Sequence, residues 1–159
     1  MMAASRSWLL RGTPRRPCSP LSHDAASYTS HMRLRLLLAL LWLGVMVGLA
    51  STPSPEDPSS GALANAVHAI QYAVFVLILL SLARAVLPRL PATVLFVPLL
   101  GVALLVGAGQ EWYQSFLPYR SADPNDIVYD TIGAVGGLLF GTLVAALWQR
   151  RGQRQLAAL

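Results

Sequence analysis

Four long apolar blocks, separated by short polar or proline-rich stretches, dominate the pattern of this chain. They cover residues 34–50, 62–87, 92–112 and 126–148. A helix rises 1.5 Å per residue, so the shortest block spans about 25 Å and the others match the roughly 30 Å of a bilayer core. The pattern therefore predicts an all-α membrane protein with four transmembrane helices.

The stretches between the blocks carry residues that end helices. Residues 51–61 read STPSPEDPSSG, and a short turn is expected around Pro88 and Pro91. Residues 111–126 read EWYQSFLPYRSADPND, which predicts a short polar exterior segment between the third and fourth helices. Pro98 falls inside the third block, where a membrane helix tolerates it.

The two ends of the chain lack such blocks. Residues 1–31 show no hydrophobic period, which predicts a disordered leader, and Met32 is an alternative start of the protein. Residues 149–159 are expected to form a basic tail. The first apolar block is read as a retained helix, although Gly48-Leu49-Ala50 also suits the cleavage site of a signal peptide.

Composition supports a membrane protein and excludes several other classes. The chain is 55% apolar and only 12% charged, against about 25% charged in a typical soluble domain. A free soluble enzyme, a disulfide-stapled secreted module and a zinc finger are therefore excluded. Cys18 is the single cysteine and can form no internal disulfide.

All 12 basic residues are arginines, and Arg120 is the only one predicted to lie on the outer side. The positive-inside rule then places both termini in the cytoplasm of a multi-pass plasma-membrane protein. Because the other arginines flank apolar blocks, their distribution indicates topology and no nucleic-acid partner. The lipid bilayer is the expected partner.

Polar side chains at membrane depth are expensive to insert, so they are the candidate functional residues. The predicted topology brings seven of them to one depth, and they form a candidate outward-facing cluster: His68, Tyr72, Glu111, Gln114, Arg120, Asp126 and Asp130. His68 also suits a packing residue, Asp126 a helix-start charge, and Arg120 either a clamp on carboxylates or a ligand contact. No metal and no cofactor are expected, because a single histidine without paired spacing makes a weak metal site.

Three glycines of the fourth block are expected to act in helix packing and not in the polar cluster. Gly133, Gly137 and Gly141 are spaced four residues apart, so they lie on one helical face. Small residues in this pattern predict close packing against another helix.

The polar segment and its neighbours resemble the VanZ-like membrane proteins over roughly residues 35–148. Seven residues stand at the positions of that family's pattern: Glu111, Gln114, Pro118, Arg120, Asp126, Thr131 and Gly133. His68 and Tyr72 resemble its H-x-x-x-Y. Ala64 and Asn65 replace a usual Asp-Lys, and Asp130 replaces a usual asparagine.

The resemblance implies an accessory role at the cell envelope, associated in the family with resistance to the glycopeptide teicoplanin. A cell-wall lipid precursor or a glycopeptide is then a possible partner. A membrane-embedded enzyme acting on a lipid-linked or phosphorylated substrate is the first alternative, with His68, Glu111 and Asp126 as acid–base groups. A small oligomeric channel or proton-coupled carrier using Asp130 and His68 is the second.

Overall fold

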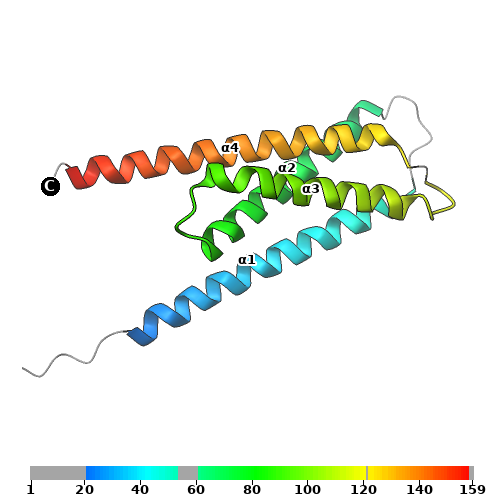
Figure 1. Ribbon diagram of the computed structural model, residues 1–159. Helices are drawn as coiled ribbons and strands as arrows, with labels where there is room; N and C mark the ends of the chain where they lie inside the picture. Colours follow the sequence, from blue (N-terminus) through cyan, green and yellow to red (C-terminus); the bar gives the residue numbers. More distant parts are fainter. Residues whose placement is uncertain (1–20, 54–60, 121, 158–159) are drawn as a thin grey trace, which may run out of the picture.

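The computed structural model describes residues 21–53, 61–120 and 122–157, and these ranges contain helices and turns without a strand. The helices are α1 (Leu21–Ala50), α2 (Gly61–Val86), α3 (Ala92–Gln114) and α4 (Pro124–Ala157). Each is long and apolar enough to cross a membrane. The prediction of an all-α protein with four transmembrane helices is confirmed, and the chain is a multi-pass membrane protein (Figure 1).

Two helices extend beyond their predicted bounds. α1 begins at Leu21, so the predicted disorder of residues 1–31 is wrong for 21–31, while residues 1–20 lie outside the described part of the chain. The eleven residues after Pro20 contain neither proline nor glycine, so nothing in them stops the helix. α4 likewise continues through the predicted tail to Ala157, because arginine and glutamine there are good helix formers.

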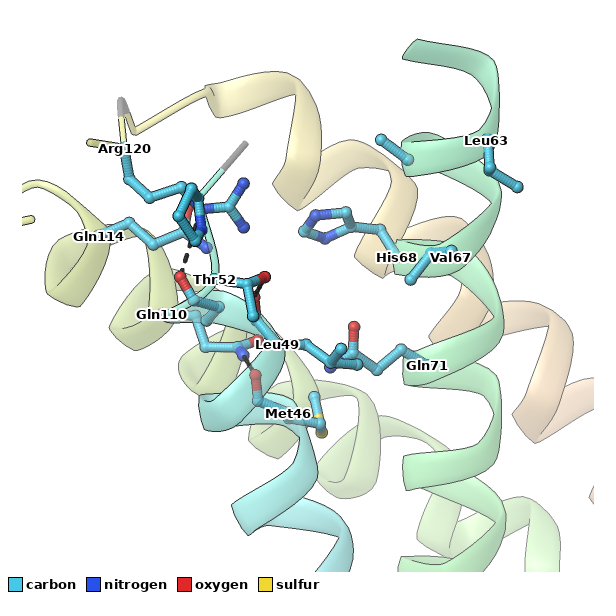
Figure 2. A pocket seen from close by; sticks show the side chains of 13 residues that line it. Met46, Leu49, Thr52, Leu63, Val67, His68, Gln71, Gln110, Gln114 and Arg120 are labelled. Carbon is cyan, nitrogen blue, oxygen red and sulfur yellow. Dashed lines mark hydrogen bonds between the residues drawn. The ribbon is translucent and has the colours of Figure 1, made fainter. Parts of the chain in front are cut away.

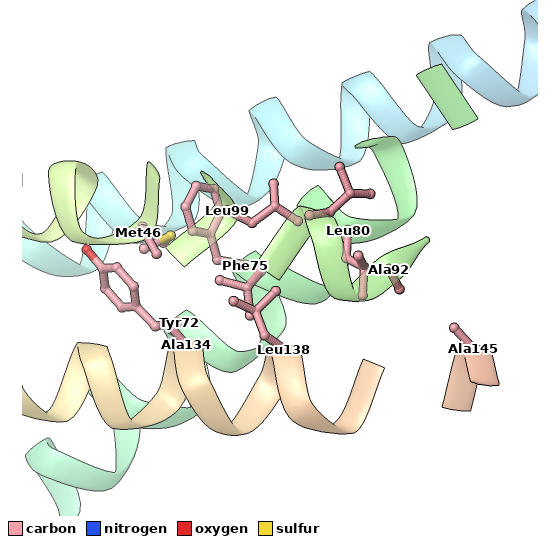
Figure 3. Packing of buried hydrophobic residues seen from close by; sticks show 12 residues of the cluster. Met46, Tyr72, Phe75, Leu80, Ala92, Leu99, Ala134, Leu138 and Ala145 are labelled. Carbon is pink, nitrogen blue, oxygen red and sulfur yellow. The ribbon is translucent and has the colours of Figure 1, made fainter. Parts of the chain in front are cut away.

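α2 is the central helix of the bundle. It packs most extensively on α4 and also contacts α1 and α3, while α3 packs on α4 as well. The buried core forms along α2, where Tyr72, Phe75 and Val76 meet Leu138 of α4 and Leu99 of α3 (Figure 3). The large apolar side chains on the outside of the bundle are exposed, as expected of surfaces that face lipid.

α1 has few buried side chains and is attached partly by hydrogen bonds. Figure 1 shows it diverging from α4 toward its own N-terminal end. Tyr28 donates to the carbonyl of Ala85 at 2.7 Å, and Arg35 donates to the carbonyl of Ser81 at 2.9 Å. Further along, the indole Nε1 of Trp42 donates to the main-chain carbonyl of Gln71 at 3.1 Å.

The glycines of α4 lie where its backbone approaches α2. A Cβ at Gly133 would overlap the main-chain carbonyl of Ala69, and one at Gly137 would lie 2.6 Å from the carbonyl oxygen of Ala73. At Gly141 it would lie 2.7 Å from a methyl group of Leu80. The absence of side chains at these positions therefore permits the contact between the two helices.

Replacing Gly133 by alanine is expected to destabilise the bundle by about 1–3 kcal/mol, because the added methyl group must push α4 away from the α2 backbone. Gly136→Ala is the matched control, since a Cβ there meets nothing within 4 Å. Thermal unfolding of both variants in detergent measures the difference. Equal stability of the two variants would contradict the close approach.

Candidate functional site

All seven predicted site residues gather at the end of the bundle where α1 and α3 end and α2 and α4 begin. His68 lies in the first half of α2, and Glu111 and Gln114 lie in the final part of α3. Asp126 and Asp130 occupy the first two turns of α4. Chain topology explains this, because antiparallel neighbouring helices return the two connections to one end.

The centre of the cluster is His68, which lies between two carboxylates of α4. Its Nδ1 is 2.9 Å from Oδ1 of Asp130, and its Nε2 is 3.4 Å from Oδ2 of Asp126. Asp130 is almost fully buried, with 3% of its surface exposed. A ring with a proton on each nitrogen can donate to both carboxylates, so this pairing offsets the desolvation of the acids.

Gly107 of α3 is part of this cluster and was missed by sequence reasoning. A Cβ at Gly107 would lie 3.2 Å from Oδ2 of Asp130 and 3.4 Å from the hydroxyl of Tyr72. Any larger residue would therefore crowd both groups. Its position four residues before Glu111, on the same buried face of α3, is the signal that could have identified it.

Tyr72 begins a chain of hydrogen bonds that crosses three helices. Its hydroxyl donates to Oε1 of Gln110 at 2.5 Å, and Nε2 of Gln110 donates to the carbonyl of Met46 at 3.1 Å. Sequence reasoning also missed Gln110, which adjoins Glu111 but lies on a different side of the helix. These hydrogen bonds link the polar cluster on α2 and α3 to the final turns of α1.

Glu111 contacts the segment between α3 and α4. It is buried, and its Oε2 accepts the backbone N–H of Asp123 at 2.8 Å. Asp123 in turn accepts the backbone N–H of Asn125 through Oδ1 at 2.9 Å, which is an N-terminal helix cap. Glu111 therefore positions the start of α4, the turn that carries Asp126.

Arg120 holds the end of α1. Its Nε donates to the carbonyl of Ala50, the last residue of α1, at 3.2 Å. A cation at a helix C-terminus satisfies free carbonyls and complements the helix dipole. Ser51 and Tyr113 share a further hydrogen bond of 3.1 Å between their hydroxyls. The sequence suggests Arg120 as a clamp on carboxylates. The described contact is instead with a main-chain carbonyl of α1.

A pocket of about 230 Å³ opens beside the cluster, between the last turns of α1, the first half of α2 and the end of α3 (Figure 2). Its polar lining includes His68 and Gln71 from α2, Gln110 and Gln114 from α3, and Arg120. Figure 2 shows the side chains of His68 and Gln71 pointing from α2 toward α1 and α3. The pocket therefore brings donors from several segments to one space.

Gln71 is the one described residue with a fully buried, unpaired polar side-chain atom. Its residue surface is only 6% exposed, and its Nε2 has no hydrogen-bond partner. An unsatisfied buried donor costs about 1–3 kcal/mol. Because Gln71 lines the pocket, this unpaired amide lies beside the space that a ligand would occupy.

The described residues contain no group of three His, Cys, Asp or Glu side chains arranged to hold a metal ion. The polar groups of the described site are hydrogen-bond donors, an imidazole held by carboxylates and a guanidinium. Such groups bind anions and can transfer protons.

A family model described as VanZ/LLP1 matches residues 19–148, which include all four helices up to Trp148. No curated protein and no solved structure matches the chain.

The pairing of His68 with Asp130 can be measured by a double-mutant cycle. Either single change, His68→Leu or Asp130→Leu, is expected to destabilise the protein by about 3 kcal/mol, because it leaves a buried charged group without its partner. The double variant is expected to lose less than the sum, with a coupling of about 1–3 kcal/mol.

Denaturant unfolding in detergent gives these values, and His31→Leu on an exposed part of α1 is the control. Strictly additive losses would show that the two side chains do not interact.

Proposed function

The chain belongs to the VanZ/LLP1 family, and from this membership and the geometry of the site we propose an accessory role at the cell envelope. The protein lies in the plasma membrane with both termini in the cytoplasm and the polar cluster facing outward. There it binds a component of the envelope. The orientation is assigned from charge, because Arg120 is the only one of the eight arginines in the described residues that lies at the cluster's end of the bundle.

The observation that carries this proposal is the pocket with polar side chains from α2, α3 and the exterior segment. Membrane proteins seldom place such groups at depth without a use for them. Here Glu111 and Arg120 position the surrounding backbone, while Gln71 and His68 face the pocket. The cluster thus has the supporting hydrogen bonds that a binding site needs.

The test uses the family's association with teicoplanin resistance. A sensitive Gram-positive host expressing the wild type is expected to tolerate more teicoplanin than the empty host. Glu111→Gln and Asp126→Asn are expected to lose this protection at equal membrane abundance, because they remove charges that hold the cluster together. The minimal inhibitory concentration is the measurement.

Asp123→Asn is the matched control, since it removes the same charge at an exposed position and keeps the oxygen that accepts from Asn125. No protection by well-expressed wild type would rule out this role. An equal loss of protection in Asp123→Asn would show that the phenotype depends on acidic charge in general and not on the structure of the cluster.

A second function, a membrane-embedded enzyme, is supported by the bond between Asp130 and His68. A carboxylate at Nδ1 orients an imidazole so that Nε2 can accept a proton from water or a hydroxyl group. Hydrolysis of a lipid-linked phosphate ester by wild type, abolished in His68→Asn, would establish this function. Absence of turnover on such substrates by protein that binds them would leave binding as the function.

A further inference from the structure

We propose that the pocket between α1 and α2 holds the anionic phosphate headgroup of a bilayer lipid, whose acyl chains remain in the membrane. This inference rests on the proposed envelope role and names the ligand class of the same pocket. Three observations carry it: an unsatisfied donor, the charge of the wall and an apolar mouth.

The first observation is the amide of Gln71. Its Nε2 is buried and unpaired, although the main-chain carbonyl of the same residue is occupied by Trp42. Gln71 also lines the pocket, so after a small rotation of its side chain Nε2 would donate to a phosphate oxygen there, which removes the desolvation penalty of the donor. Gln114, only 2% exposed, lines the same pocket and offers a second amide.

The second observation is that the described wall carries a guanidinium and no acid. Arg120 lines it, whereas none of the 13 described lining residues is an aspartate or glutamate. The nearby acids are engaged behind the wall: Asp126 and Asp130 contact His68, and Glu111 accepts from the backbone. The surface that a ligand meets therefore favours an anion, which Arg120 suits well.

The third observation is the position and size of the pocket. Leu63, 70% exposed, Val67 and Leu49 line it and belong to the lipid-facing surfaces of α1 and α2. A molecule in the bilayer can thus reach the polar groups from the side. About 230 Å³ is below the roughly 300–1,000 Å³ of pockets that enclose drug-sized ligands, so the space suits a headgroup and not a glycopeptide.

The experiment is native mass spectrometry of the full chain released from nanodiscs that contain equal amounts of phosphatidylglycerol and phosphatidylcholine. Wild type is expected to retain one phosphatidylglycerol. Gln71→Leu is expected to retain it about tenfold less, because the donor to the phosphate is gone. The same variant should unfold at an unchanged or higher temperature, since it removes an unsatisfied polar group.

Arg120 supplies a second variant and the bundle supplies a control. Arg120→Gln is expected to lose the lipid, and Arg120→Lys to retain more of it than Arg120→Gln, because it keeps the charge. Arg84→Gln removes the same charge at the opposite end of α2 and is expected to behave as wild type. Retention by Gln71→Leu and Arg120→Gln at the level of wild type would overturn the proposal, as would equal loss in Arg84→Gln.

Adding inorganic phosphate separates a lipid headgroup from a free anion. Lipid that stays bound in millimolar phosphate supports the proposal, whereas displacement by phosphate alone would assign the pocket to a soluble anion and overturn it. The envelope role is tested separately. A wild-type protein that retains lipid but gives no protection against teicoplanin would contradict the envelope role and leave the lipid assignment intact. Protection without retained lipid would overturn only the lipid assignment.

Discussion

The close approach of α4 to α2 at Gly133 is the constraint on which the polar end of the protein depends. Asp130 lies three residues before this glycine and Asp126 one further turn away, so both carboxylates face His68 only while the two backbones stay in contact. The small-residue seam and the charged cluster are thus two parts of one helix–helix interface. Packing at the glycines and pairing at the acids stabilise the same arrangement.

α1 joins this interface by different means. It buries few side chains, and hydrogen bonds from Trp42, Gln110 and Arg120 hold its C-terminal half to the other helices. In a bilayer such bonds matter because lipid is as apolar as the helix surfaces, so no hydrophobic driving force brings apolar helices together. The pocket lies where this helix meets α2 and α3, so its shape depends on polar contacts more than on the core.

The fold and part of the site could be predicted from the sequence. Runs of apolar residues identify transmembrane helices because a bilayer demands them, and the rule held for all four blocks. Hydropathy does not mark a helix boundary where an apolar run continues into polar helix-forming residues, which is why the start of α1 and the end of α4 were misplaced. The polar residues at membrane depth were identified by the free-energy cost of placing them in lipid, and all seven lie at one end of the bundle.

The contacts that complete the site could not be read from the sequence. Gly107 and Gln110 matter through groups on other helices, and no local pattern shows that Asp130 and Tyr72 pack against Gly107. Gln71 is a polar residue within the second apolar block, and that its amide is unpaired depends on the side chains that surround it in three dimensions. Pairwise geometry between helices, and not the identity of each helix, was the missing information.

The way α1 is attached bears on whether it is a removable export signal. Met46, Leu49 and Ala50 form one side of the pocket, and the carbonyls of Met46 and Ala50 accept bonds from Gln110 and Arg120. A peptidase that cut after Ala50 would remove this wall, open the pocket to lipid along its whole length and leave both donors without those acceptors. The first helix is in this sense a structural part of the pocket, and the pocket keeps its described shape only while that helix is retained.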